Sequence, residues 1–207
     1  MSFKWGWMIQ EIVSPIIFSI FFLFSGVHDK GITWIFFIIW NVHYFNRSVL
    51  FPLRQKQTAR CPVAIVLSAV FFNIINGFTN GYFLGYLAQY DFNYIYSLQF
   101  IIGLIVLLLG VVINVKSDNI LIGIKKKHND YQIPNGFMYN YISCPNYFGE
   151  IIEWIGFYIM TLSAPALIFV FWTMCNLIPR AISNHNWYIN KFSDYPKNRK
   201  AVIPFLI

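Results

Sequence analysis

Long apolar runs constrain the fold of this chain more than any other feature. Only 11% of its 207 residues are charged, against roughly 25% in ordinary soluble domains. Several runs reach the length of about 20 apolar residues that crosses the hydrocarbon core of a bilayer. The predicted transmembrane helices are Met8–Val27, Trp34–Val49, Pro62–Ala88, Tyr94–Val115, Tyr147–Leu162 and Ala164–Ala181. The sequence therefore predicts an all-α, polytopic membrane helix bundle with about six transmembrane helices, built as a single domain over residues 1–207.

The break between the last two predicted helices decides the topology. Ser163, Ala164 and Pro165 separate them, and proline removes a backbone donor and clashes with the preceding turn. Six spans place fourteen of the fifteen Lys and Arg residues on one side and leave only Lys30 on the other. By the positive-inside rule the cation-rich side, with both termini, is cytoplasmic. We expect a multi-pass protein of a bacterial inner membrane or of the endoplasmic reticulum.

The charge and the composition exclude several classes of site. A net charge of +7 is explained by anionic lipid headgroups or an anionic cofactor, so nucleic acid is not expected as a partner. The three cysteines and four histidines show no spacing typical of metal ligands. No phosphate-binding or nucleophile-elbow motif occurs. We therefore expect no metal.

Two polar segments and one glycine series stand out between the apolar runs. The segment Lys116–Asn146 and the tail from Arg180 onward are long, basic and aromatic. Long loops of this kind are usually functional when they are ordered, and these two are predicted to cover an anion-binding cavity from the cytoplasmic side. Gly77, Gly81 and Gly85 form a GxxxGxxxG series that favours close helix packing.

Two polar groups interrupt the first two predicted helices. Glu11, beside Gln10, either lies near the headgroups or faces the bundle interior, as most intramembrane carboxylates do. Tyr44 is either an interfacial tyrosine, followed by Arg47 snorkelling to the headgroups, or a proton donor inside a pocket. A phenol held by a second polar group can polarise a carbonyl.

Five further polar residues lie near the ends of the fourth and fifth predicted helices. Asn114 and Asp118 are four residues apart and share one helix face. Glu150 lies at the start of the fifth helix, where the helix dipole favours a carboxylate, and Glu153 lies deeper. Asn146 is predicted to be the N-cap of this helix.

Four sequence blocks resemble the steroid 5α-reductase family. They are Val42–Arg47 (VHYFNR), Asn114–Asp118 (NVKSD), Asn146–Gly156 (NYFGEIIEWIG) and Tyr195–Phe205 (YPKNRKAVIPF). Their order along the chain is the same as in that family.

The resemblance implies an NADPH-dependent reductase of a 3-oxo-Δ4 steroid, with the cofactor inside the bundle under cytoplasmic loops. Glu11 and Tyr44, with Gln10 beside them, match the pair that holds the 3-oxo group of the substrate. The positions that the resemblance assigns to the cofactor are Asn114, Asp118, Lys125, Tyr131, Asn146, Glu150, Arg180, His185, Tyr188 and Arg199. Glu153 and Trp154 also match the family blocks.

Some assignments stay open. Lys125 stands where the family commonly has arginine, and the loop Gln55–Arg60 leaves open whether Lys56 or Arg60 meets the 2′-phosphate. The substrate is a steroid enone or another lipid enone, such as a polyprenal or an enoyl thioester. A membrane methyltransferase that uses S-adenosylmethionine and a non-enzymatic scaffold or carrier are the alternatives. We expect a monomer.

Overall fold

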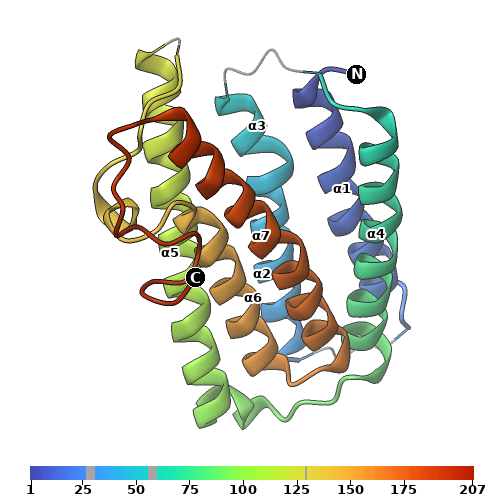
Figure 1. The fold of residues 1–207 in the computed structure, drawn as a ribbon. Helices are drawn as coiled ribbons and strands as arrows, with labels where there is room; N and C mark the ends of the chain where they lie inside the picture. The colour runs from blue at the N-terminus through green and yellow to red at the C-terminus, as the bar shows by residue number, and fades with distance from the viewer. Residues whose placement is uncertain (27–30, 56–59, 129) are drawn as a thin grey trace. The chain divides into compact units, whose positions relative to one another are not determined.

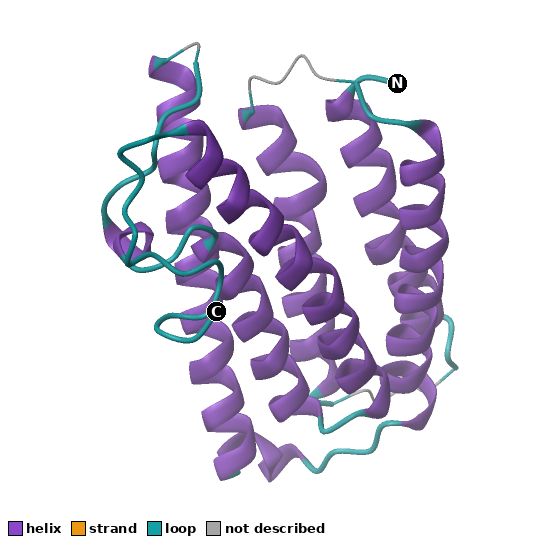
Figure 2. Cartoon of the chain, in the orientation of Figure 1, coloured by secondary structure: helices purple, strands orange, loops and turns teal. Residues whose placement is uncertain are grey.

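The computed structural model describes residues 1–26, 31–55, 60–128 and 130–207. These residues form helices joined by loops, and no strand occurs among them (Figure 2). The prediction of an all-α fold is confirmed. The chain divides into two compact units, Met1–Ser97 and Leu98–Ile207, which we call unit 1 and unit 2.

Unit 1 is built around three long helical runs (Figure 1). The second run starts as α2 and continues without interruption through a π-helical turn into a short α-helix. The third run also ends in a π-helical turn. The elements are α1 (Phe3–Leu23), α2 (Thr33–Phe45), η1 (Asn46–Leu50), α3 (Phe51–Arg54), α4 (Val63–Tyr82), η2 (Phe83–Leu87) and a short 3-10 helix, η3 (Phe92–Tyr96).

The glycine series of α4 brings this helix into backbone contact with α1. A Cβ atom added to Gly77 would lie 2.6 Å from the Ser14 carbonyl oxygen, and one added to Gly81 would lie 2.5 Å from that of Phe18. Gly85 meets the backbone of α1 in the same way. No side chain fits at these distances, so the prediction of close helix packing is confirmed.

Unit 2 contains the fourth, fifth and sixth helical runs. They are α5 (Leu98–Lys127), α6 (Pro145–Thr161) and α7 (Ala164–Lys191), with a 3-10 helix, η4 (Phe137–Asn140), before α6. The predicted break before Pro165 is confirmed. Leu162 ends α6 in a left-handed conformation with φ 45°, and the Ser163 hydroxyl accepts a hydrogen bond from the Ala166 amide that caps α7.

Several boundaries differ from the prediction. Helix α5 continues through the three lysines to Lys127, so the first part of the segment Lys116–Asn146 is helical; cations in the last turn of a helix are stabilised by its dipole. Helix α7 likewise continues to Lys191. Asn146 is not the N-cap of α6, because Cys144 takes that position and Pro145 begins the helix, as its fixed φ favours.

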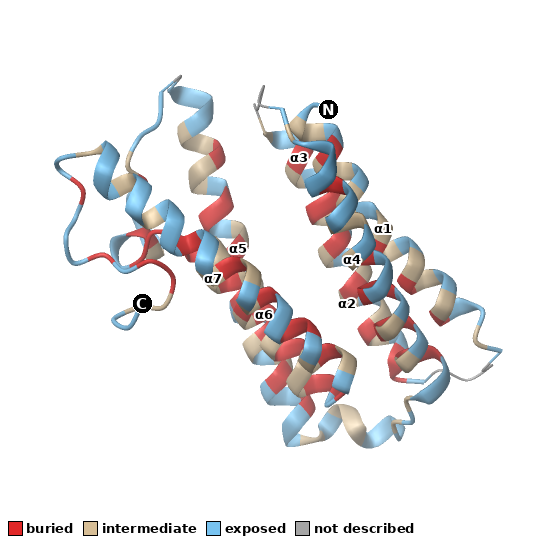
Figure 3. Cartoon of the chain, turned by 45° about the vertical axis from the view of Figure 1, so that its right-hand side comes forward, coloured by how far each residue is buried: buried red, intermediate tan, exposed pale blue. Residues whose placement is uncertain are grey.

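The helical runs fit an integral membrane protein. Four helices are long and apolar enough to cross a bilayer: α1, the run Val63–Leu87, α5 and α7. The runs that contain α2 and α6 are the other two of the predicted six. Along α4, buried and exposed residues alternate (Figure 3), and its exposed residues include Phe71, Ile75 and Phe78. An exposed apolar face on such a helix suits contact with lipid chains.

Candidate active site

Tyr44 lies in the interior of unit 1. Its side chain is buried, and its phenol oxygen accepts a hydrogen bond from the side-chain amide of Asn76, at 3.3 Å. The Ser48 hydroxyl donates to the Tyr44 carbonyl oxygen at 2.6 Å. The Trp40 and His43 rings lie 5.2 Å and 5.1 Å from the Tyr44 ring. The phenol is therefore enclosed by side chains, and the interfacial placement of Tyr44 is wrong.

Glu11 and Gln10 lie on α1, in the same unit. Both are half-buried, and the Gln10 side-chain amide donates to Oε1 of Glu11 at 3.2 Å. The Gln10 carbonyl oxygen accepts from Asn73 of α4 at 2.7 Å. Helix α4 is thus hydrogen-bonded both to the helix of the candidate carboxylate and to the helix of the candidate phenol.

Three asparagines of α4 were not identified from the sequence as functional positions. Asn73, Asn76 and Asn80 are buried and lie three and four residues apart, on one helix face. In the sequence, three asparagines at this spacing inside an apolar span are the signal that could have identified them. Polar side chains in a membrane helix usually face the bundle interior, and these do.

Arg47 is buried as well. Of the two alternatives for this region, the one in which Arg47 snorkels to the headgroups is wrong, because its side chain is only 7% exposed. Its guanidinium lies over both the Trp7 and the Phe51 ring, 5.1 Å and 4.9 Å from their centroids. Aromatic faces attract a cation electrostatically, so these rings stabilise the buried guanidinium of Arg47.

A second polar cluster joins α5 to α6 in unit 2. The Asn114 side-chain amide donates to the Asn146 carbonyl oxygen at 2.9 Å, and the Asn146 side-chain amide donates to Oδ1 of Asp118 at 3.1 Å. Gly149 permits this contact, since a Cβ atom at this position would collide with the Asn114 backbone nitrogen. Three residues that the sequence assigned to the cofactor are thereby brought together.

Tyr139 of η4 adjoins this cluster. Its hydroxyl donates to the Ser117 carbonyl oxygen at 3.3 Å. Burial, and then the nearby Asp118 charge, raise the pKa of Tyr139 well above its ordinary value, because both disfavour a phenolate. Tyr139 is thus a neutral donor at neutral pH.

The C-terminal segment is held against the turn before α6. The Ser143 hydroxyl lies 2.6 Å from Nδ1 of His185 and 2.6 Å from the Tyr195 hydroxyl. The Ser143 amide donates to the Lys200 carbonyl oxygen at 2.8 Å, and the Lys200 amide donates to that of Tyr141 at 2.9 Å. Ser143 therefore links α7 and the chain end, which are distant from it in sequence.

Arg199 lies in this C-terminal segment, and its side chain is held by the loop that contains Pro134 and Asn135. Its side chain is 4% exposed; Nη1 and Nη2 donate to the Pro134 carbonyl oxygen and to Oδ1 of Asn135, both at 3.0 Å. Its guanidinium also lies 5.1 Å from the centroid of the Tyr195 ring. Within the described part of the chain, the buried Nε has no hydrogen-bond acceptor.

The remaining predicted cofactor residues are less enclosed. Tyr188 stacks on Tyr195 with 5.5 Å between ring centroids, and Tyr131 packs edge-on against Trp187 at 4.9 Å. The side chain of Glu150 is half-buried, whereas those of Lys125 and Arg180 are exposed, as is that of Arg60. Lys56 lies outside the described residues.

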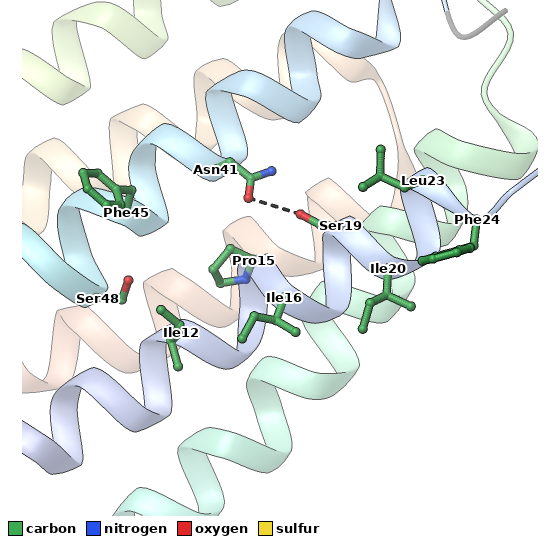
Figure 4. Close-up of a pocket in the computed structure, with 10 residues that line it drawn as sticks. All are labelled: Ile12, Pro15, Ile16, Ser19, Ile20, Leu23, Phe24, Asn41, Phe45 and Ser48. Carbon is green, nitrogen blue, oxygen red and sulfur yellow. Dashed lines mark hydrogen bonds between the residues drawn. The ribbon is translucent and has the colours of Figure 1, made fainter. Parts of the chain in front are cut away.

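A groove of about 500 Å³ runs between α1 and α2 on unit 1 (Figure 4). Ser19 donates a hydrogen bond to Asn41 across it at 3.2 Å, and most of its other lining side chains are apolar. Ser48, which bonds to the backbone of Tyr44, lies at one end. The lining residues are Ile12, Pro15, Ile16, Ser19, Ile20, Leu23, Phe24, Asn41, Phe45 and Ser48.

No cluster of metal-ligating side chains occurs in the segments that the structure describes. The polar side chains described in the two units include hydroxyls, amides, carboxylates, the imidazole of His185 and the guanidinium groups of Arg47 and Arg199. Such groups hold the hydroxyls, amide and phosphates of a nucleotide or the carbonyl of an enone.

Comparison with known proteins gives a consistent family. A sequence model of the 3-oxo-5-alpha-steroid 4-dehydrogenase family matches residues 59–207. Steroid 5-alpha-reductase of Gossypium hirsutum is 40% identical over 210 residues, which cover 97% of this chain and 81% of that protein. The steroid 5-alpha-reductase of Solanum lycopersicum is 40% identical over 168 residues, 79% of this chain and 65% of that protein. The 3-oxo-5-alpha-steroid 4-dehydrogenase 1 of Mus musculus is 35% identical over 167 residues, 80% of this chain and 66% of that protein.

The match extends over both units. The family model covers all of unit 2 and the last part of unit 1. The alignment with the Gossypium hirsutum protein covers nearly the whole chain. This chain therefore belongs to the 3-oxo-5-alpha-steroid 4-dehydrogenase family, a family of membrane oxidoreductases.

Proposed function

We propose that this protein reduces the Δ4 double bond of a 3-oxo steroid with NADPH. The observation that carries the proposal is the buried phenol of Tyr44, whose oxygen is held by an amide of a neighbouring helix. A phenol so placed suits the carbonyl of an apolar substrate, because hydrogen bonds to developing charge are strongest where water is excluded.

Tyr44 acts as the acid of the reaction. Its hydroxyl donates to the 3-oxo oxygen, where negative charge develops as C5 accepts a hydride. Protonation of C4 then completes the saturated ketone, so that the double bond gains one hydride and one proton. When bound, the reduced nicotinamide supplies that hydride. General acids contribute roughly 10²- to 10⁴-fold to such rates.

Glu11 and Gln10 support this acid. The hydrogen bond from Gln10 fixes the Glu11 carboxyl group at 3.2 Å, and we assign Glu11 to the orientation of Tyr44 and the 3-oxo group. The apolar groove of about 500 Å³ on the same unit falls within the size range of small-molecule sites. Its lining does not include Tyr44 or Glu11, so it suits the apolar body of a lipophilic substrate rather than its carbonyl group.

The residues of unit 2 fit a dinucleotide. The unused Nε of Arg199 suits a phosphate oxygen, which guanidinium groups bind strongly. Asp118, Asn114 and Asn146 offer carboxylate and amide groups that match ribose hydroxyls and a carboxamide. The other side chains that we assign to NADPH are those of Lys125, Tyr131, Glu150, Arg180, His185 and Tyr188.

The proposal includes the membrane topology of the chain. We place both termini on the cytoplasmic side, where the cations lie, and we treat residues 1–207 as one monomeric reductase domain made of two compact units. The cations of the chain then face the compartment that supplies NADPH.

Purified protein in detergent tests the proposal. Progesterone should cause oxidation of NADPH and yield a steroid heavier by two hydrogens. Tyr44→Phe should lower kcat by about 10²-fold or more. Tyr86→Phe is the matched control, since the exposed Tyr86 hydroxyl in the same unit donates to the Phe24 carbonyl oxygen.

Two results would contradict the proposal. Wild-type kcat in the Tyr44→Phe variant removes this phenol from the mechanism. S-adenosylmethionine rather than a nicotinamide dinucleotide, found by mass spectrometry in the purified protein, would identify a methyltransferase instead.

A further inference from the structure

Asn76 and Asn80 of α4 form a hydrogen-bonded pair beside Tyr44. Their side chains are only 4% and 1% exposed, inside a helix that is otherwise apolar enough to cross a membrane. Buried amides are costly unless their hydrogen bonds are made. Which atom of each amide donates and which accepts therefore decides whether Tyr44 receives or gives a hydrogen bond.

The backbone fixes the direction of the whole series. Nδ2 of Asn80 lies 3.1 Å from the Asn76 carbonyl oxygen, and a carbonyl oxygen can only accept. The same Nδ2 lies 3.0 Å from Oδ1 of Asn76, so the Asn76 side chain must turn its oxygen toward Asn80. Its NH2 group then faces Tyr44, at 3.3 Å from the phenol oxygen.

The phenol oxygen of Tyr44 thus receives a hydrogen bond rather than giving one to α4. The opposite orientation of Asn76 would present an oxygen to Tyr44 and would hold the phenol proton against α4. With the observed orientation, that proton is directed away from α4.

We propose that Asn80 and Asn76 form an amide relay that keeps the oxygen of Tyr44 as an acceptor and directs its proton to the 3-oxo oxygen of the substrate. The inference rests on the proposed function and adds two positioning residues to it. As the proton moves toward the substrate, negative charge grows on the phenol oxygen, and the bond from Asn76 strengthens. The bond from Asn80 polarises the Asn76 amide in the same sense.

Kinetics of two variants test the relay with progesterone and NADPH. Asn76→Leu should lower kcat by about 3- to 10-fold, the scale of one neutral hydrogen bond. Asn80→Leu, which removes the hydrogen bond from Asn80 to the Asn76 side chain, should lower kcat by about 2- to 3-fold through the loss of orientation. The KM for progesterone should change less than kcat. Thr79→Val is the matched control, because the Thr79 hydroxyl donates to backbone carbonyl oxygens of its own helix.

A double-mutant cycle separates positioning from stability. In a Tyr44→Phe background, Asn76→Leu should have no further effect on the residual kcat, since both changes remove the same interaction. An equal loss of kcat in both backgrounds, or wild-type kcat in Asn76→Leu, would refute the relay. Thermal unfolding in detergent shows whether each variant is folded.

A spectroscopic test needs no turnover. The carbonyl stretch of progesterone labelled with ¹³C at C3 should shift to lower frequency on binding the wild-type protein, because Tyr44 polarises the bond. The shift should be lost in Tyr44→Phe and reduced in Asn76→Leu. An unchanged shift in Asn76→Leu alone would refute the relay but leave the proposed function standing, whereas an absent shift and absent turnover in the wild type would refute both.

Discussion

The two units bring their helices together with different arrangements of glycine. In unit 1 the glycines that meet a partner backbone, Gly77, Gly81 and Gly85, all lie on the run Val63–Leu87, whereas Gly6 of α1 faces only side chains, those of Val66 and Met1. In unit 2 both partners contribute: Gly103 and Gly110 on α5 face Gly149 and Gly156 on α6. The first contact is one-sided, and the second is reciprocal.

The difference decides how the polar groups are placed. In unit 1 Asn76, next to Gly77, reaches Tyr44 of α2, whereas Asn80, next to Gly81, bonds to Asn76 on the same helix. In unit 2 the backbones approach so closely that Asn114 bonds directly to the carbonyl oxygen of Asn146 on the partner helix. The reciprocal contact is therefore part of the polar cluster itself.

Gly110→Ala tests the reciprocal contact and should have the largest effect. A Cβ atom there would collide with the Glu153 backbone nitrogen, and backbone atoms cannot move aside as a flexible side chain can. We expect a loss of about 3 kcal/mol in the free energy of unfolding, measured by thermal unfolding in detergent.

Two further substitutions serve as comparisons for the loss of stability in Gly110→Ala. Gly123→Ala on the same helix should leave stability unchanged or slightly raised, since a Cβ atom there meets nothing within 4 Å and alanine favours helix. Gly85→Ala in unit 1 should cost less than Gly110→Ala, because its Cβ would lie 2.9 Å from the nearest atom, the Phe21 carbonyl oxygen. A larger loss in Gly85→Ala would reverse the comparison.

Each unit also buries an arginine: Arg47 in unit 1 lies over the Trp7 and Phe51 rings, whereas Arg199 in unit 2 holds a distant loop. Its guanidinium holds the loop at Pro134 and Asn135, about one helix-loop-helix away along the chain. Arg199→Ala should raise the KM for NADPH by about 10-fold or more, the range of a lost charged hydrogen bond. The KM for progesterone should rise less, because its proposed site lies in unit 1.

Steady-state kinetics with each substrate varied in turn measure both constants. Lys197→Ala is the matched control, as this exposed cation lies in the same segment. Equal increases in the two KM values would show that Arg199 supports the whole fold rather than the cofactor.

The two units also differ in how much of their helix packing could be predicted from the sequence. The glycine series of α4 was recognised because its four-residue spacing is a known packing pattern. The glycines of α5 and α6 are seven residues apart on each helix. Their role in close helix packing becomes evident only when the two helices are placed together. A single-helix pattern thus revealed the one-sided contact but not the reciprocal one.

The polar groups show the same limit. Family blocks pointed to Asn114, Asp118 and Asn146, which the structure joins by hydrogen bonds. The role of Asn76 beside Tyr44 was not visible, because it depends on the rotation of α4 relative to α2. The bonds of Ser143 to His185 and Tyr195 join three distant segments, and no local signal in the sequence indicates them.

Each unit also buries a phenol, and the two differ in the direction of their hydrogen bonds. Tyr44 accepts from an amide, whereas Tyr139 donates to the Ser117 carbonyl oxygen. Tyr139→Phe should therefore lower the free energy of unfolding at pH 7 by only about 1 kcal/mol, the net value of one hydrogen bond.

The pH dependence of that small difference tests its cause. The pKa of Tyr139 is raised above 10.0 in the folded protein by burial and by Asp118, so the unfolded phenol ionises first as pH rises. Between these two pKa values the unfolded state binds fewer protons, and the wild type loses up to about 1.4 kcal/mol of stability per pH unit. Tyr139→Phe lacks this loss, so the gap between wild type and variant should close above pH 10, whereas Tyr141→Phe, at an exposed position, should match the wild type throughout. A gap that stays constant from pH 7 to about pH 11 would show that the Tyr139 phenol ionises as readily in the folded protein as in the unfolded chain.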